Sequence, residues 1–251
     1  AAASCRCRDQ RIASGDRLKI MAAVPAIIAA ALAASTSHDA RATAPIPYLA
    51  LGDSYTIGES VESADRWPAQ LAAALRADGV SIEDPRIIAR TGWTTDELSA
   101  AIDAVEPLGD HYGLVTLLIG VNDQYRGRGV DEYAHAFAIL LERAIGFAGR
   151  RTDRVLVLAI PDWGVTPFAA QSGRDTAAIA RELDAFNATV AKICARRGVA
   201  FIDIAPMSRE RGAESAMLAD DGLHPSPAMY AHWASLAMPV ARRILAQTPP
   251  P

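Results

Sequence analysis

The chain has 251 residues, of which 51% are hydrophobic and 22% are charged, a composition typical of a globular protein with one sizeable core. Its formal net charge of -4 and its scattered basic residues offer no general attraction for phosphate backbones, which excludes nucleic acid from the expected partners. The three cysteines predict no disulfide framework, and Cys5 and Cys7 have no nearby His or further Cys to complete a metal site.

Residues 1–44 are expected to form a leader that precedes one domain over residues 45–251. Arg17 and Lys19 come before an apolar run of about 14 residues, too short to span a bilayer comfortably and typical of a signal-peptide core. The small residues of "ARA" predict cleavage near Ala42. We therefore expect an exported protein, periplasmic or extracellular, with no permanent membrane span after cleavage. An uncleaved leader would instead anchor it to the membrane.

Beyond the leader, short apolar segments alternate with segments of helical periodicity. The apolar segments are rich in Val, Ile and Leu without alternating polar residues, which is typical of parallel strands buried on both faces. They are "YLAL" at 48–51, "RIIA" at 86–89, "LVTLLIGV" at 114–121, "VLVLAI" at 155–160 and "VAFIDI" at 199–204. Because their spacing suits βαβ units, we expect a parallel sheet.

Helix signals occupy the gaps between the expected strands. Apolar residues recur every four positions from Trp67 to Leu75, and Gly79 follows as a C-terminal cap. Either Thr94 or Thr95 can cap "DELSAAIDAV", whose first turn is acidic. Further helices are expected at 131–147, 174–197 and 227–245.

This alternation predicts an α/β fold, a three-layer α/β/α sandwich around a five-stranded parallel sheet in the flavodoxin-like order 2-1-3-4-5. In such sheets ligands bind beyond the carboxyl ends of the strands where the winding reverses, here between the first strand and its neighbours. Ser54, in "GDSY", follows the first strand directly. Gly, Asp and Ser are also ordinary turn residues, so a loop serine is the alternative to a nucleophile.

The second and third expected strands run into motifs that suit a reacting serine, "RTGW" with Gly92 and "GVND" with Asn122. Acyl transfer needs hydrogen-bond donors aimed at a developing oxyanion. The main-chain N–H of Gly92 and the side-chain amide of Asn122 are suitable donors, and the N–H of Ser54 is a third. The neighbouring Asp53 and Asp123 are expected to hold loop geometry through their own backbone hydrogen bonds.

A serine hydroxyl also needs a base, and His224 is the candidate. It stands in "DDGLHPSP", in a long loop between the last strand and the last helix. Asp221, three residues earlier, can orient the imidazole and stabilise its cation, with Asp220 as a rival. We expect this loop to fold back over the carboxyl ends of the strands.

Four motifs, "GDSY", "RTGW", "GVND" and "DGLHP", each follow the expected strand that the fold requires, in this order. Together they resemble the four sequence blocks of the SGNH hydrolases, also called the GDSL esterase and lipase family. The resemblance spans Gly52 to Pro225. Tyr55 stands where Leu is the nominal residue, a substitution that leaves the chemistry untouched. The α/β-hydrolase elbow G-x-S-x-G is absent, since no Gly stands two residues after Ser54.

The resemblance implies an enzyme, a serine hydrolase that cleaves carboxylic esters through an acyl-enzyme. It makes Ser54 the nucleophile, His224 the base and Asp221 the third member, because the family places the acid three residues before the histidine. Ser54, Gly92 and Asn122 become the oxyanion donors. Neither a metal nor an organic cofactor is expected.

The expected substrate is a small-molecule ester: a short acyl ester, a lysophospholipid and an acetylated sugar all remain open. Trp163 and Phe168, in "PDWGVTPFAAQSGR" after the fourth strand, form a candidate acyl-binding wall or lid. The alternative is a surface loop whose aromatic residues pack on the sheet edge. Trp93, beside Gly92, has the same two interpretations. Nothing in the sequence predicts an oligomeric state.

Two functions of other classes also stay open: an acyltransferase that excludes water, and a non-catalytic carbohydrate- or lipid-binding module. Ser54, Asn122, Asp221 and His224 are all intact. This favours an enzyme, because a binding module does not need all four.

Overall fold

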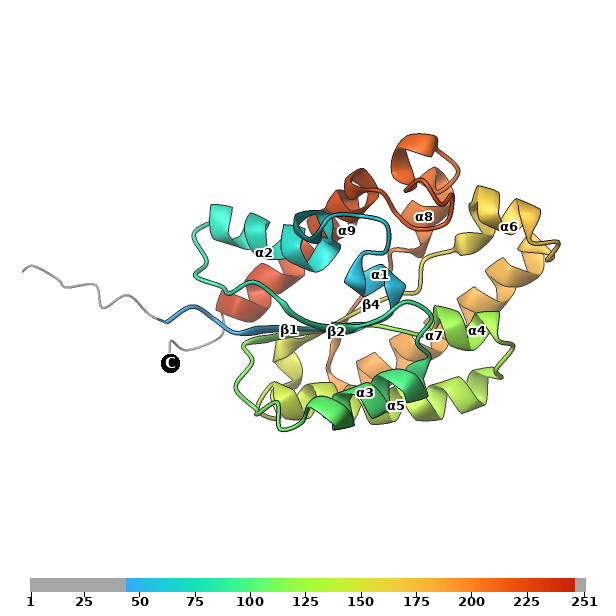
Figure 1. Ribbon diagram of the computed structural model, residues 1–251. Helices are drawn as coiled ribbons and strands as arrows, with labels where there is room; N and C mark the ends of the chain where they lie inside the picture. The colour runs from blue at the N-terminus through green and yellow to red at the C-terminus, as the bar shows by residue number, and fades with distance from the viewer. Residues whose placement is uncertain (1–43, 247–251) are drawn as a thin grey trace, which may run out of the picture. The chain divides into compact units, whose positions relative to one another are not determined.

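The computed structural model describes residues 44–246 of the chain, in which strands and helices alternate (Figure 1). The expected leader with its cleavage position near Ala42 lies outside the described residues, as do Cys5 and Cys7. None of the helices between residues 44 and 246 combines the length and the apolar character that crossing a membrane requires.

The described residues form a five-stranded parallel sheet in the order β2-β1-β3-β4-β5, which confirms the predicted fold class. The strands are β1 (Tyr48–Gly52), β2 (Arg86–Ala89), β3 (Leu114–Leu118), β4 (Val155–Leu158) and β5 (Ala200–Ile202). The three central strands are buried along their whole length, as their Val-, Ile- and Leu-rich sequences predict. The edge strands β2 and β5 are partly exposed.

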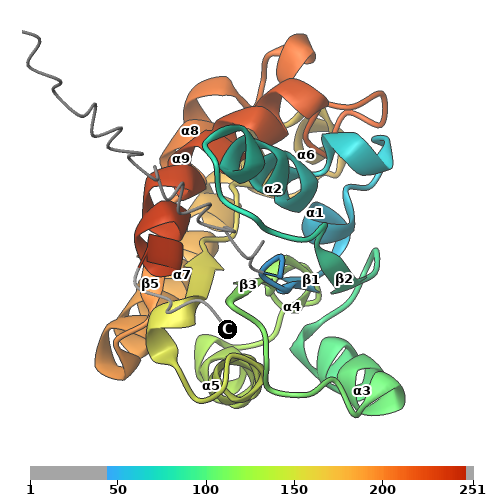
Figure 2. The same ribbon diagram turned by 90° about the vertical axis from the view of Figure 1, so that its left-hand side faces the viewer.

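Helices cover both faces of the sheet (Figures 1 and 2). On one face α2 (Trp67–Ala77) packs against α9 (Pro227–Ala246). The other face carries α3 (Thr95–Val105), α5 (Val130–Phe147) and α7 (Thr176–Arg197). Shorter helices lie in the connections: α1 (Ser54–Ile57), α4 (Val121–Tyr125), α6 (Pro167–Gln171) and α8 (Ala205–Arg211), with 3-10 turns η1 (Ser63–Asp65), η2 (Thr152–Arg154), η3 (Trp163–Val165) and η4 (Ser215–Met217).

Local signals account for the ends of several helices. Thr94 is the N-cap of α3, one of the two predicted caps, and Glu97 completes a capping box there. Gly198, with a left-handed φ of 67°, ends α7. Inside α7, Cys194 is fully buried as a small apolar residue, and burial raises the pKa of its thiol to about 12.

The register of the sheet brings the ends of three strands together. Gly52 pairs with Ala89 on one side and with Leu118 on the other. A Cβ on Gly52 would lie 2.2 Å from Oγ1 of Thr56 and 2.4 Å from the carbonyl oxygen of Leu118, so a glycine is required where β1 turns into α1. The residues that follow β1, β2 and β3 consequently lie beside one another.

The connection between β5 and α9 is more ordered than the long loop predicted from the sequence. It contains α8 and η4, and the N–H of Asp162 donates to Oγ of Ser208 in α8 over 2.8 Å. Further on, Leu218 and Pro225 form an antiparallel bridge. This bridge closes the loop that carries the predicted acid and base, whose position is thus held by backbone pairing.

Candidate active site

A cavity of about 210 Å³ lies where β1, β2 and β3 end. Four of the predicted site residues line it, namely Ser54, Gly92, Asn122 and His224. The other lining residues are largely apolar or aromatic: Tyr55, Thr91, Val121, Tyr125, Trp163, Phe168 and Leu223. The structure therefore brings together residues that are far apart in the chain, in a mostly apolar setting.

Ser54 is the first residue of α1, and 5% of its surface is exposed. Oδ1 of Asp53, the N-cap, accepts from the N–H of Tyr55 over 3.0 Å, which confirms the local role predicted for Asp53. The N–H of the first residue of a helix has no acceptor within that helix. The main-chain N–H of Ser54 is therefore available to donate to an oxygen atom of a ligand. Ser54 therefore presents a hydroxyl and a main-chain donor at one point.

Asp221, and not its rival Asp220, holds the imidazole of His224. The two atoms Nδ1 of His224 and Oδ2 of Asp221 are 2.6 Å apart, and Oδ1 accepts from the N–H groups of Leu223 and His224, each over 2.9 Å. Partial burial raises the pKa of Asp221, but these hydrogen bonds outweigh it and lower the pKa to about 2.

An ionised carboxylate accepts hydrogen bonds and does not donate them. Nδ1 of His224 therefore carries the hydrogen, which leaves Nε2 as the nitrogen available to act as a base. Among the described residues, no hydrogen bond joins Ser54 to His224. This is compatible with catalysis, because catalytic hydrogen bonds are often long before substrate binds.

Tyr55 has a contact that the sequence reasoning missed. Its ring packs edge-on against the imidazole of His224, with 5.7 Å between the ring centroids, and against the Trp233 ring at 5.9 Å. The residue after the candidate nucleophile thus supports the candidate base. No local pattern signals this, because the partners are distant in sequence.

Asn122 and Gly92 both line the cavity, from the segments that follow β3 and β2. Nδ2 of Asn122 donates one hydrogen to the carbonyl oxygen of Trp93 over 2.9 Å, which orients the amide and leaves its second hydrogen free for another acceptor. Gly92 has a φ of 86° in a turn closed by the N–H of Trp93 and the carbonyl of Arg90, 3.2 Å apart. The Trp93 indole packs against the hydrophobic core and is not among the described residues that line the cavity.

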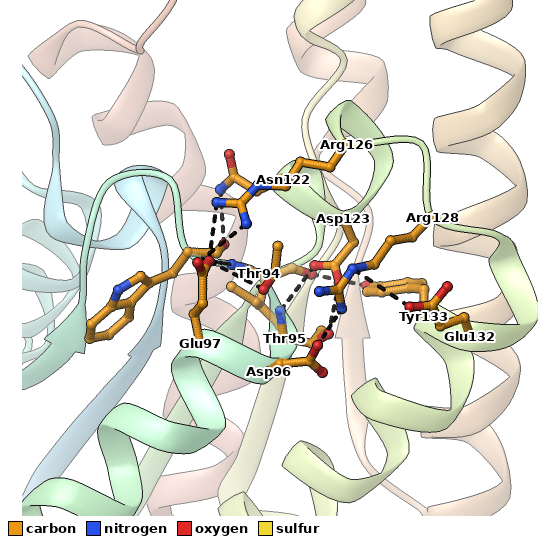
Figure 3. Close-up of polar contacts among 12 residues, drawn as sticks. Thr94, Thr95, Asp96, Glu97, Asn122, Asp123, Arg126, Arg128, Glu132 and Tyr133 are labelled. Atoms are coloured by element: carbon orange, nitrogen blue, oxygen red, sulfur yellow. Dashed lines mark hydrogen bonds and ion pairs between the residues drawn. The ribbon is translucent and has the colours of Figure 1, made fainter.

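The prediction that Asp123 holds its own loop through local backbone hydrogen bonds was wrong. Its two carboxylate oxygens accept from the N–H of Thr95 over 3.0 Å and from Oγ1 of Thr95 over 2.8 Å, and Arg128 approaches to 3.1 Å (Figure 3). These bonds tie the start of α3 to α4. The error has a physical reason: Thr95 lies 28 residues away, and only the pairing of β1 with both β2 and β3 places the two loops together.

The loop after β4 supplies one wall of the cavity. Trp163 is 2% exposed, and its Nε1 donates to Oε1 of Gln124 over 2.9 Å. Phe168, 36% exposed, lies nearer the mouth, and its N–H donates to the carbonyl of Gly222 in the loop of His224 over 3.2 Å. Arg174 rests above the rings of Tyr125 and Trp163, 5.2 and 5.3 Å from their centroids.

Asp53 is a carboxyl group with an unusual environment next to Ser54. It is fully buried, and its Oδ2 has no hydrogen-bond partner among the described residues. Burial, with a smaller contribution from the nearby charge of Asp123, raises the pKa of Asp53 to about 8. In the described part of the chain, no three His, Cys, Asp or Glu side chains converge in a way that could hold a metal ion.

Comparison with known proteins gives one family and several structural relatives. The model of the GDSL-like lipase/acylhydrolase family matches residues 50–232. No curated protein matches the sequence. The solved structures that resemble this one include those described as TesA, a lipase/acylhydrolase from Enterococcus faecalis, and the psychrotrophic esterase EstA from Pseudoalteromonas sp. inhibited by monoethylphosphonate.

The structural likeness extends over most of each chain. TesA has a TM-score of 0.62 at 20% identity, with 79% of this chain and 99% of that chain covered. The E. faecalis protein has a TM-score of 0.60 at 18% identity, with 82% of this chain and 98% of that chain covered. EstA has a TM-score of 0.54 at 18% identity, with 80% of this chain and 94% of that chain covered. At such identities the likeness establishes the fold.

Proposed function

The chain belongs to the GDSL-like lipase/acylhydrolase family, the SGNH carboxylic ester hydrolases, and from this premise we propose that it hydrolyses short-chain esters with Ser54 as the nucleophile. One observation carries the proposal: the same cavity is lined by Ser54, His224, Gly92 and Asn122. Asp221 is hydrogen-bonded to Nδ1 of the His224 imidazole, which leaves Nε2 available.

The first half of the reaction forms an acyl-enzyme. Oγ of Ser54 attacks the ester carbonyl while Nε2 of His224 takes the hydroxyl proton, and Asp221 stabilises the imidazolium. The N–H of Ser54, the N–H of Gly92 and the amide of Asn122 donate to the oxyanion. The imidazolium then gives its proton to the alcohol oxygen as the bond from that oxygen to the carbonyl carbon breaks.

The second half returns the enzyme to its starting state. Water takes the place of the alcohol, and Nε2 of His224 removes a proton from it as its oxygen attacks the acyl carbon. The proton passes to Oγ of Ser54 when the acyl group leaves as a carboxylic acid. Each step uses groups that this chain supplies.

The size of the cavity supports a short acyl chain. A cavity of about 150 Å³ takes the six carbons of benzene, so roughly eight non-hydrogen atoms suit this one. Its volume is about 210 Å³. The walls formed by Val121, Trp163 and Leu223 favour an apolar group. An ester of a two- to six-carbon acid therefore suits it better than a long-chain lipid.

The test is labelling with a fluorophosphonate probe, followed by rates for p-nitrophenyl esters from acetate to decanoate, each with and without an alcohol acceptor. We expect stoichiometric labelling and the highest kcat/KM near butyrate. The Ser54→Ala variant should fold, resist labelling, and lose about four to six orders of magnitude in kcat.

The alternative functions correspond to distinct outcomes of this test. A wild-type protein that takes up no probe and cleaves no ester is a non-catalytic carbohydrate- or lipid-binding module. Preferential transfer of the acyl group to the alcohol makes it an acyltransferase. A maximum at decanoate refutes the short-chain substrate while leaving Ser54 as the nucleophile.

We also propose that the protein acts outside the cytoplasm, because the charged and apolar pattern ahead of residue 44 suits a signal peptide. Expression of the full sequence with fractionation and N-terminal sequencing tests this. A mature N-terminus just after Ala42 is expected, and retention of the intact chain in the cytoplasm refutes it.

A further inference from the structure

We propose that Arg126 is a positioning residue for the oxyanion donors, because its guanidinium group holds the backbone at Gly92. This inference rests on the proposed function, in which Gly92 and Asn122 bind the oxyanion. Arg126 follows α4 directly, and its side chain is 48% exposed.

Gly92 needs an external constraint on its backbone. It has a φ of 86°, in the region that glycine enters without steric cost. Apart from its chain neighbours, no described residue has an atom within 4 Å of a Cβ placed on it, so the space beside its Cα is open. Hydrogen bonds must therefore define the direction of its peptide groups.

Arg126 provides such a bond. Its Nη2 donates to the carbonyl oxygen of Gly92 over 2.7 Å, a charge-assisted hydrogen bond of short length. Nη1 lies 3.2 Å from Oε1 of Glu97. Glu97 in turn accepts from the N–H of its cap residue Thr94 over 2.8 Å, so the carboxylate that orients Arg126 is itself anchored to α3. Figure 3 shows this bridge from α4 to α3.

The bond from Arg126 completes a series along one segment. Residues 92–95 are held by α4 and the residue after it. Arg126 donates to the carbonyl of Gly92, and Asn122 donates to the carbonyl of Trp93. Asp123 accepts from Thr95 (Figure 3). The same helix thus carries one oxyanion donor and orients the segment of the other. The two donors must lie at the distance that lets both bind one oxygen atom. Losing the hydrogen bond from Arg126 should therefore make the position of the Gly92 donor less well defined.

The test compares kcat and KM of Arg126→Ala, Arg126→Lys and wild type for p-nitrophenyl butyrate, with the rate of fluorophosphonate labelling. We expect Arg126→Ala to lower kcat about tenfold, less than the roughly hundredfold or greater cost of losing an oxyanion donor, with KM within about twofold. Labelling should slow in parallel, since its transition state uses the same donors. Lysine keeps the positive charge and one donor nitrogen, so it should recover part of kcat.

Arg90→Ala is the matched control. Arg90 is exposed in the same turn, carries the same charge, and makes no side-chain hydrogen bond or ion pair with the described residues. It should keep wild-type kcat. Equal kcat in Arg126→Ala and wild type refutes the inference, as does an equal loss in Arg90→Ala, which would indicate a general charge effect. An inactive, unlabelled wild type instead refutes the proposed function.

Discussion

The hydroxyl of Ser60 donates to Oδ2 of Asp221 over 2.9 Å, across 161 residues of sequence. Ser60 has a φ of 65°, a left-handed conformation that is uncommon for a residue other than glycine. It belongs to the connection after α1, so the segment that carries the candidate nucleophile also contacts the candidate acid. Oδ2 accepts from Ser60 and from the imidazole of His224 together.

Ser60→Ala should lower kcat/KM about fivefold, the equivalent of about 1 kcal/mol for one solvent-accessible hydrogen bond to a charged group. The carboxylate of Asp221 then has one fewer hydrogen-bond donor, so its orientation is less restricted. The measurement is kcat/KM for p-nitrophenyl butyrate.

Ser60→Gly separates the hydroxyl from the backbone. Glycine adopts the left-handed conformation without strain, so a loss equal to that of alanine assigns the effect to the hydrogen bond. Wild-type activity in both variants would show that the contact with Asp221 has no part in the reaction.

Asp53 should make stability fall as pH rises. The pKa of this buried carboxyl is raised to about 8 in the folded protein. The unfolded value is about 3.9. Between about pH 4 and pH 8 the folded protein keeps a proton that the unfolded chain has lost. This contribution to the free energy of unfolding is therefore fully present at low pH and is lost as pH rises to about 8.

Asp53→Asn removes the titration, because the amide stays neutral. The free energy of unfolding in urea, measured at pH 5, 7 and 9, should shift in favour of the variant relative to wild type as pH increases. Asp203→Asn is the control, an exposed residue whose Oδ1 likewise accepts from a backbone N–H two residues on. Parallel pH curves for wild type and Asp53→Asn would contradict this assignment.

Arg209 should anchor the loop that forms the cavity wall. Its Nε lies 2.7 Å from Oδ2 of Asp162, which is almost wholly buried, and its Nη2 lies 2.7 Å from Asp184. Arg209→Ala leaves the carboxylate of Asp162 without its cation and should destabilise the protein by about 2 kcal/mol. KM should also rise, because Trp163 follows Asp162 directly.

Thermal unfolding and KM for p-nitrophenyl butyrate measure the two effects. Arg181→Ala, in α7, is the control, since both members of its pair with Asp175 lie at the surface and such pairs contribute little. Equal melting temperatures for the two variants would show that the pair with Asp162 does not anchor the loop.

Trp163 should limit the length of the acyl chain. Trp163→Leu keeps the wall apolar but enlarges the cavity, so the ratio of kcat/KM for octanoate to that for butyrate should rise about tenfold. Phe168→Ala is the comparison: Phe168 is already partly exposed at the mouth, and the shift should be smaller. An unchanged ratio in Trp163→Leu would place the acyl chain elsewhere.

The sequence by itself determined the sheet and predicted most residues of the candidate site. Buried parallel strands require continuous apolar runs, and helices require a period near four, so both patterns are local and readable. The alternation suits the strand order 2-1-3-4-5, and that order predicts that Ser54, Gly92 and Asn122 meet where β1, β2 and β3 end. Asp221 lies close enough to His224 in sequence for their contact to be predicted.

Only the tertiary structure decided the contacts between segments. That Asp123 binds Thr95, that the ring of Tyr55 supports His224, and that Trp93 faces the core are consequences of packing between distant elements. The same holds for the wall formed by the loop after β4. Hydrogen bonds and ring contacts depend on positions in space to within fractions of an ångström, and side chains distant in sequence acquire such positions only when the sheet and its helices have assembled.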